Sequence, residues 1–231
     1  EGNYPEGGAI NLWNDGLSYN KILINAGTHG DEKAPCYATM LAFKDLLSSN
    51  AAWAIRVKSN VTIYVCPTLN PYGFQNRTLA NANGVNINRD IVSQTQPESI
   101  AWKAWVDKNA DAIAYLDMHG VDFYTPFFEF SKNDTDAHVK EYAHLAFRLS
   151  SELKENWDKT FEVRGWARPY LLKSTYEGMT LDYIAEMGIK GFIIETPCDV
   201  VSNQHNPAPN YFKSYSKSNK MTKDMLINLL S

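Results

Sequence analysis

Five short apolar runs are spread along the chain, and each is rich in β-branched or aromatic residues. Runs of this kind, bounded by glycine, proline or polar residues, are typical of buried strands. We therefore predict strands over residues 21–27, 61–67, 112–120, 125–130 and 191–197.

Between these runs the apolar residues recur at spacings of three and four, which is the period of a helix with one buried face. This pattern predicts amphipathic helices over residues 32–49, 97–110, 134–154, 178–188 and 209–230. Strands that alternate with helices predict an α/β fold, which we expect to be a three-layer α/β/α sandwich around a mixed, twisted, mostly parallel sheet. Because the sequence shows no linker, repeat or low-complexity tract, we expect residues 1–231 to form a single domain.

Polar residues directly follow several predicted strands. An α/β sheet binds its ligands at this place, beyond the carboxyl ends of the strands. His29 and Glu32 follow the first strand, and the segment 70–89 follows the second. His119 closes the third strand and Glu195 closes the last. We therefore expect the site to lie at this edge of the sheet.

His29, Glu32 and His119 supply the ligands that a catalytic zinc ion takes, which are three His or carboxylate groups with a fourth position left for water. His29 and Glu32 are three residues apart, so they can converge where a strand turns into a helix. Gly27 and Gly30 would let the backbone make that turn. Taken singly, each ligand is also typical of an ordinary structural position, and that alternative stays open at this step.

Two further segments carry the remaining motifs. The block "NPYGFQNRTLANANGVNINRD" (70–90) contains Asn-Pro-x-Gly and then Gly-Val-x-x-Asn-Arg, and "FIIETP" delivers Glu195 from an apolar strand. In this order along the chain, with "LDMHG" between them, the pieces resemble the zinc carboxypeptidase family. This is the carboxypeptidase A-like clan that also holds murein peptide amidases and the succinylglutamate desuccinylase/aspartoacylase branch. The resemblance runs from about residue 20 to about residue 200, which is most of the chain.

The resemblance implies a hydrolase with one Zn²⁺ per chain, bound by His29, Glu32 and His119. It also implies that Glu195 acts as the general base and then as the general acid. That role has a physical basis, because zinc lowers the pKa of its bound water toward ~7 and a neighbouring carboxylate can pass the proton to the leaving nitrogen.

The resemblance also assigns the substrate-binding residues. Asn88 and Arg89 match the pair that grips the free carboxylate of the substrate, which suits a planar guanidinium that donates two parallel hydrogen bonds. Arg77 is the candidate for the catalytic arginine that polarises the scissile carbonyl. Tyr176 lies near the place of the mobile tyrosine that caps the substrate carboxylate. A solvated loop arginine and a packing or rim tyrosine are the alternatives for these two residues.

Two positions depart from the family's pattern. Leu79 holds the place of the family's arginine, and Arg77 lies two residues upstream, so a loop shift is needed for it to reach the site. Asn86 stands where the family has an aspartate that orients a zinc-ligating histidine. A neutral amide still accepts a ring N–H hydrogen bond but supports the imidazole less, and Asp117 is the candidate substitute.

The leading hypothesis is a metallocarboxypeptidase that cleaves an amide bond next to a free carboxylate with zinc-activated water. A peptide or an acyl amino acid is the expected substrate. The compact block 70–90 leaves a murein peptide amidase and an N-acyl amino acid deacylase open as alternatives. A catalytically silent carboxylate-binding module of the same fold is the alternative from another class of protein.

Composition narrows the kinds of partner and the location that we expect for this protein. The chain has 22 basic and 26 acidic residues and no long run of either sign, so we expect no nucleic-acid partner. No apolar stretch approaches the roughly 20 residues of a membrane span, so we expect a soluble chain. It begins at Glu1, as a mature secreted or periplasmic form or an excised domain would, and the location is not decided. The three cysteines, Cys36, Cys66 and Cys198, predict neither a disulfide framework nor a thiolate zinc site.

Overall fold

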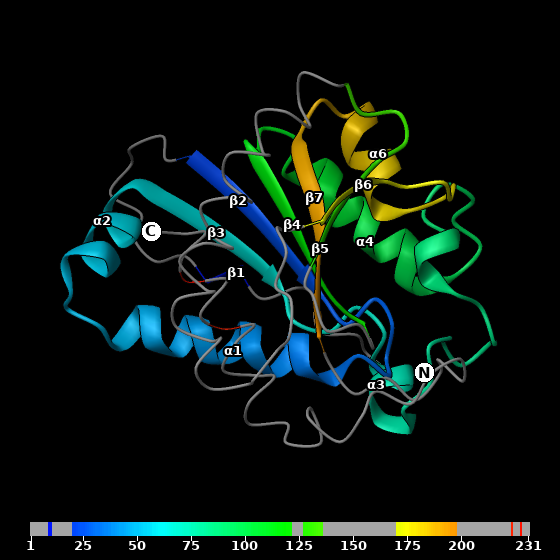
Figure 1. Cartoon of the computed structure of the whole chain (residues 1–231), viewed down its shortest axis with the longest axis horizontal. Helices are drawn as coiled ribbons and strands as arrows, with labels where there is room; N and C mark the ends of the chain where they lie inside the picture. The colour runs from blue at the N-terminus through cyan, green and yellow to red at the C-terminus, as the bar shows by residue number, and fades with distance from the viewer. Residues whose placement is uncertain are drawn as a thin grey trace.

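The computed structural model of the chain describes residues 9–10, 20–121, 127–135 and 170–197, together with Lys223 and Ile227. The strands in these residues are β1 Ala9–Ile10, β2 Asn20–Ala26, β3 Val61–Cys66, β4 Ala114–Val121, β5 Phe127–Phe130, β6 Tyr170–Lys173 and β7 Lys190–Pro197. They form one sheet in the order β1-β3-β2-β4-β7-β5-β6 (Figure 1). The pairs β1–β3 and β5–β7 are antiparallel and the other neighbours are parallel, so the sheet is mixed and mostly parallel, as predicted.

Helices cover both faces of this sheet. The described helices are α1 Lys33–Ser48, α2 Ala52–Asn60, α3 Pro71–Asn76, α4 Pro97–Lys108 and α6 Thr180–Glu186, with a 3-10 turn η1 at Ile87–Arg89. Figure 1 shows α1 and α2 on one side of the sheet and α4 and α6 on the other. The fold is therefore the predicted three-layer α/β/α sandwich. None of the described helices has the length and apolar character that a membrane span requires.

The two faces of the sheet bury separate apolar clusters. Along β4, Leu116 and Met118 pack into the cluster under α1 and α2, whereas Tyr115 packs into the cluster under α4 and α6. The same alternation in β7 sends Ile194 to the first cluster and Ile193 to the second. Because both faces are covered, most successive residues are apolar, which is why these strands read as nearly continuous apolar runs.

All five predicted strands are present as β2, β3, β4, β5 and β7, and their ends differ from the prediction by no more than two residues. The predicted helices 32–49, 97–110 and 178–188 are α1, α4 and α6. The predicted helices 134–154 and 209–230 lie outside the described residues except for residues 134–135, Lys223 and Ile227. Lys223 and Ile227, the two described positions in the last of them, are helical.

The pattern of apolar residues does not predict four of the described elements. Helix α2 buries only Ala54 and Val57, so it lacks the stripe that identifies an amphipathic helix. Helix α3 has six residues and strands β1 and β6 have two and four, which is too short for a period to show. Their positions follow from the tertiary structure around them.

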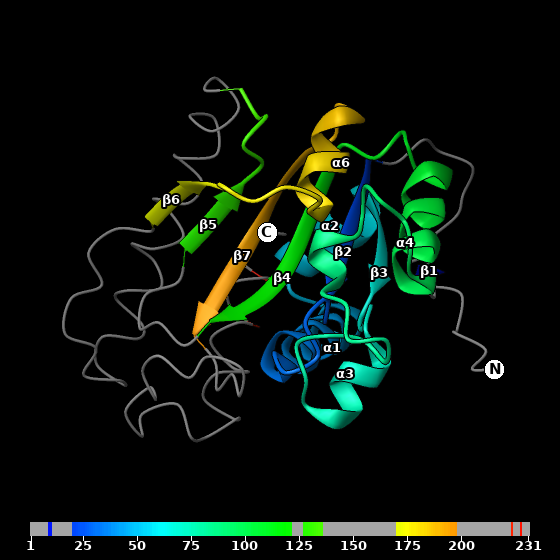
Figure 2. The same ribbon diagram turned by 90° about the vertical axis from the view of Figure 1, so that its right-hand side faces the viewer.

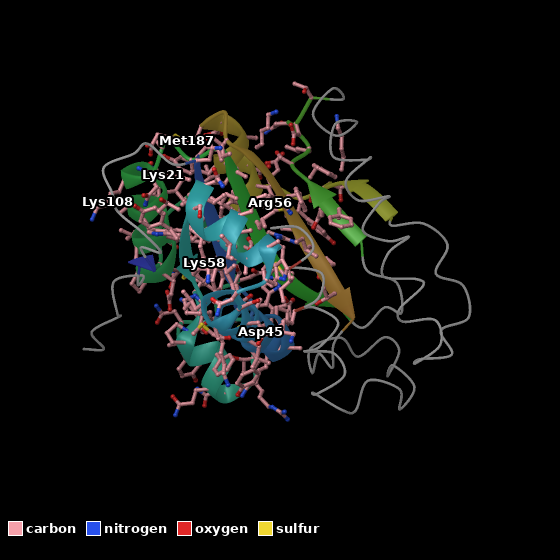
Figure 3. The ribbon with its side chains drawn as sticks, turned by 90° about the vertical axis from the view of Figure 1, so that its left-hand side faces the viewer. Lys21, Asp45, Arg56, Lys58, Lys108 and Met187 are labelled. Atoms are coloured by element: carbon pink, nitrogen blue, oxygen red, sulfur yellow. The ribbon has the colours of Figure 1, made fainter. Side chains whose placement is uncertain are left out.

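The site is expected where parallel strands end together. β2, β4 and β7 are adjacent and parallel, and β4 and β7 point to the same edge (Figure 2). In this pairing His119 lies directly opposite Glu195. The edge where the strands begin carries Lys21, Lys108 and Met187 (Figure 3), and Lys21 binds Asp111 there at 2.8 Å.

Candidate metal centre

The turn between β2 and α1 places His29 and Glu32. Gly27 has a φ of +67°, in the left-handed region that favours glycine. Gly30 is required for another reason, because a Cβ there would lie 1.9 Å from the carbonyl carbon of Gly73 in α3. The predicted turn is present, with one glycine needed for its conformation and the other for a close approach between backbones.

The structure brings His29, Glu32 and His119 together, with their candidate ligand atoms within 4.8 Å of one another. Glu32 lies between the two rings: its Oε1 is 2.6 Å from His29 Nδ1 and its Oε2 is 3.1 Å from His119 Nδ1. The backbone N–H of Gly120 donates to the same Oε2 at 2.8 Å. The three side chains, which come from two regions far apart in the sequence, therefore form one cluster that could hold a metal ion.

Buried atoms without partners show that this cluster suits a metal ion. Both ring nitrogens of His119 lie near carboxylate oxygens of Glu32 and Asp117 but make no well-aligned hydrogen bond with a described residue, and neither does the buried Oε2 of Glu195. Leaving such an atom unsatisfied costs about 1–3 kcal/mol, and a metal ion at Nδ1 of His119 would satisfy that nitrogen. Two imidazoles and one carboxylate are a donor set found at catalytic zinc sites.

Each histidine has an oxygen acceptor behind it. Asn86 Oδ1 lies 3.1 Å from His29 Nε2, so the neutral amide occupies the predicted supporting position. Asp117 Oδ1 lies 3.3 Å from His119 Nε2. Asp117 therefore supports His119 and not His29, because residues two apart in a strand point to the same face. In both histidines Nδ1 is left facing Glu32, which is the arrangement that a metal ligand needs.

The pKa values in the cluster depend on burial and on the charges of neighbouring side chains. Burial acts to raise the pKa of Glu32, but His29 and His119 outweigh it and hold that pKa at about 2. Burial acts to lower the pKa of His119, but Asp117 and Glu32 raise it well above its ordinary value. Because a metal ion binds the neutral imidazole, its binding here would release a proton from His119.

Glu195 stands beside the cluster on β7. It is partly buried, and its Oε2 is fully buried. Burial raises the pKa of its carboxyl group well above the ordinary value, and the negative charge of Glu32 raises it further, whereas His119 opposes the rise. A carboxyl group with a raised pKa next to a candidate metal site is suited to taking up and returning a proton.

The predicted carboxylate-binding residues also come together. Asn88, in η1, is buried, and its Oδ1 accepts a hydrogen bond from the backbone N–H of Thr180 at 3.0 Å. Arg89 is exposed, and its guanidinium donates to the backbone oxygen of Asn88 at 2.6 Å and stacks on the ring of Tyr176 at 4.0 Å. Since the amide oxygen of Asn88 is engaged, its NH₂ group is the side that can bind a ligand.

Arg77 is placed differently. It lies at the end of α3 with an exposed side chain and a φ of 57°, and its backbone N–H bonds to the carbonyl of Gly73. A left-handed residue at this position is a usual way to end a helix. The catalytic role of Arg77 therefore stays a prediction.

Two of the three cysteines lie in described residues, and neither forms a disulfide. Cys36 and Cys66 are free thiols, and burial raises the pKa of each to about 12. Neither belongs to the metal cluster. Cys198 lies outside the described residues.

Sequence reasoning missed Asn25 and Thr180, which are both fully buried in the site. Each contacts Asp117 through a side-chain hydrogen bond. Signals for both exist in the sequence, because Asn25 interrupts the apolar run of β2 and Thr180 stands at the start of a predicted helix. Neither signal identifies the partner.

Comparisons with known proteins concern the family and the fold of the chain. Residues 9–222 match the family model described as zinc carboxypeptidase, peptidase M14. A search of curated proteins finds no match.

Solved structures show the same fold at low sequence identity. A metallo-carboxypeptidase from Burkholderia cenocepacia has a TM-score of 0.69 and 20% identity, over 94% of this chain and 57% of that one. A putative carboxypeptidase A from Shewanella denitrificans has a TM-score of 0.69 and 19% identity, over 94% and 58%. A metallo-carboxypeptidase from Pseudomonas aeruginosa in complex with (2-guanidinoethylmercapto)succinic acid has a TM-score of 0.68 and 20% identity, over 93% and 57%. The chain thus spans somewhat more than half the length of these neighbours.

Proposed function

Because this chain belongs to the zinc carboxypeptidase family, whose cofactor is zinc, we propose that it is a metallocarboxypeptidase that cleaves the amide bond next to a free carboxylate. The observation that carries the proposal is the His29–Glu32–His119 cluster with the partnerless, buried Oε2 of Glu195 beside it. These residues combine a three-ligand metal site with a group able to carry a proton.

In the proposed mechanism His29 Nδ1, His119 Nδ1 and the Glu32 carboxylate hold the zinc ion. When bound, zinc supplies Lewis acidity to the attacking water and to the scissile carbonyl. Glu195 takes the proton of the attacking water at Oε2 and returns it to the leaving nitrogen. Its raised pKa supports this role, because a carboxylate of ordinary pKa is a weaker base.

Asn88 and Arg89 bind the free carboxylate of the substrate in this proposal. The NH₂ group of Asn88 and the guanidinium of Arg89 each donate hydrogen bonds, and Tyr176 holds one face of the guanidinium. The Pseudomonas aeruginosa neighbour binds a succinic acid derivative, which supports a carboxylate ligand for a site of this fold. Arg77 is proposed to reach the carbonyl oxygen only after the loop behind α3 moves.

One further prediction belongs to the proposal, which is that residues 1–231 act as one catalytic domain.

The test combines metal analysis with a substrate panel. We expect one zinc per chain by elemental analysis, and hydrolysis of peptides with a free C-terminus but not of the same peptides with an amidated C-terminus. Equal cleavage of the free and the amidated peptides would contradict the carboxylate-binding role of Asn88 and Arg89. Muropeptides and N-acyl amino acids belong in the same panel, because cleavage of these alone would favour an amidase or a deacylase. Bound zinc without any hydrolysis would favour a silent binding module.

A further inference from the structure

We propose that Thr180 is a positioning residue for both halves of the site, acting on His119 through its hydroxyl and on Asn88 through its backbone amide. Thr180 is the first residue of α6 and is fully buried. The inference rests on the proposed function, because it takes His119 as a metal ligand and Asn88 as a carboxylate-binding residue.

Asp117 connects the hydroxyl of Thr180 to His119. Asp117 Oδ2 accepts from Thr180 Oγ1 at 2.6 Å and from Tyr115 Oη at 3.0 Å. Its Oδ1 accepts from Asn25 Nδ2 at 2.8 Å and lies 3.3 Å from His119 Nε2. An ionised carboxylate, which can only accept, satisfies all of these donors at once. Asp117 is therefore a fully buried acceptor that joins β2, β4 and α6 behind His119.

Thr180 supplies the stronger of the two contacts that reach Asp117 from outside the sheet, since the hydroxyl of Thr28 lies 3.5 Å from Asp117 Oδ1. Asn25 donates from β2, the neighbour of β4 in the sheet, and Tyr115 donates from β4 itself, the strand that carries Asp117. The hydroxyl of Thr180 donates from α6 and is the shortest of these hydrogen bonds. Without it, the carboxylate plane can turn about the remaining donors, and the distance from Oδ1 to His119 Nε2 is no longer held. Partners that hold the second nitrogen of a metal-ligating histidine change metal affinity by about 10- to 100-fold.

The backbone of Thr180 acts on the other half of the site. Its N–H donates to Asn88 Oδ1 at 3.0 Å, and this bond decides which end of the amide faces a ligand. With the oxygen bound to α6, the NH₂ group is presented to the substrate carboxylate. Thr180 thus donates one hydrogen bond toward the metal side and one toward the carboxylate side, and the two can be removed separately.

Thr180→Val removes the hydroxyl and keeps both the side-chain shape and the backbone N–H. We expect the zinc dissociation constant, measured by chelator competition, to rise about tenfold. KM for peptides with a free C-terminus, measured at saturating zinc, should stay within about twofold of the original because the bond to Asn88 remains. Thr180→Ser is the matched control, since it restores the hydroxyl and should restore zinc affinity.

Thr180→Pro removes the N–H as well. Proline is favoured at the first position of a helix, and Met179 already has the extended backbone, with ψ of 162°, that precedes a proline. We expect the loss of zinc affinity seen for Thr180→Val together with a rise of about fivefold in KM for peptides with a free C-terminus. If this variant does not fold, the Val and Ser pair still decides the role of the hydroxyl.

The outcomes separate this inference from the proposed function. Unaltered zinc affinity in Thr180→Val, with a wild type that binds zinc and hydrolyses peptides, overturns the inference and leaves the function standing. Equal losses in the Val and Ser variants also overturn it, because they indicate packing and not the hydroxyl. A wild type that binds no zinc and cleaves no peptide overturns the proposed function itself. Thermal unfolding of the metal-free variants checks that none of these results comes from a lost fold.

Discussion

The metal half and the carboxylate-binding half of the site are built in different ways. His119 and Glu32 are 1% and 7% exposed, and sheet register and hydrogen bonds hold them. Arg89 is exposed and Tyr176 is 56% exposed, and the contact between them is a single stack of a cation on a ring. Buried polar groups act at low dielectric and cannot be replaced by water, whereas exposed groups can. We therefore expect large effects of substitution in the metal half and a small effect at Tyr176, which only stacks on Arg89.

The largest effect is expected at Glu195. Glu195→Gln keeps the shape of the side chain but cannot take a proton, so kcat should fall about 10³-fold while one zinc per chain remains bound. Steady-state kinetics and elemental analysis of the same preparation measure both quantities. Loss of zinc in this variant would show that Glu195 is a ligand and not the base.

A second prediction concerns Asp90, which directly follows Arg89 of the carboxylate-binding half. The Asp90 carboxylate is buried and accepts from the backbone N–H groups of Thr95 at 3.0 Å and Gln96 at 2.9 Å and from the hydroxyl of Ser99. Burial acts to raise the pKa of Asp90, but these hydrogen bonds outweigh it and lower the pKa below its ordinary value. We expect Asp90→Asn to reduce the free energy of unfolding by about 2 kcal/mol near neutral pH.

The pH dependence of that difference follows from the lowered pKa. Stability from a carboxyl group with a lowered folded-state pKa is complete above the unfolded pKa of about 3.9 and is lost as the pH falls through the folded value. The difference between wild type and Asp90→Asn should therefore shrink below about pH 4. Urea unfolding across this range measures it, and a difference that does not change with pH would contradict the assignment to the carboxylate.

The smallest effect is expected at Tyr176. Tyr176→Ala removes the ring under Arg89 and should raise KM for peptides with a free C-terminus about threefold, as expected for an exposed cation–π contact. Tyr176→Phe keeps the ring and should leave KM within about twofold of the original value. If the Phe variant behaves like the Ala variant, the hydroxyl acts on the substrate and Tyr176 is a cap of the kind found in the family.

Local features of the site were predictable from the sequence to different degrees. The His-x-x-Glu turn was predictable because Gly27 directly follows β2 and the segment that forms α1 carries an apolar stripe. The supporting residues were less predictable, since Asn86 could be placed behind a histidine only through the family resemblance, and Asp117 proved to lie behind His119. Helix α2 was missed because it buries only two residues. The catalytic role of Arg77 stays a prediction, because its exposed position at the end of α3 does not determine whether its guanidinium contacts the substrate carbonyl.

The sequence by itself determined five strands, β2, β3, β4, β5 and β7, the amphipathic helices α1, α4 and α6, and the residue types that a zinc hydrolase needs at strand ends. These are consequences of local spacing, because periods of 2 and 3.6 residues and the i, i+3 relation act over a few residues. Only the tertiary structure decided that Thr180 contacts Asp117 across 63 residues and Asn88 across 92 residues. Those contacts depend on the order in which β2, β4 and β7 enter the sheet and on α6 covering its face, and no spacing along the chain encodes that order.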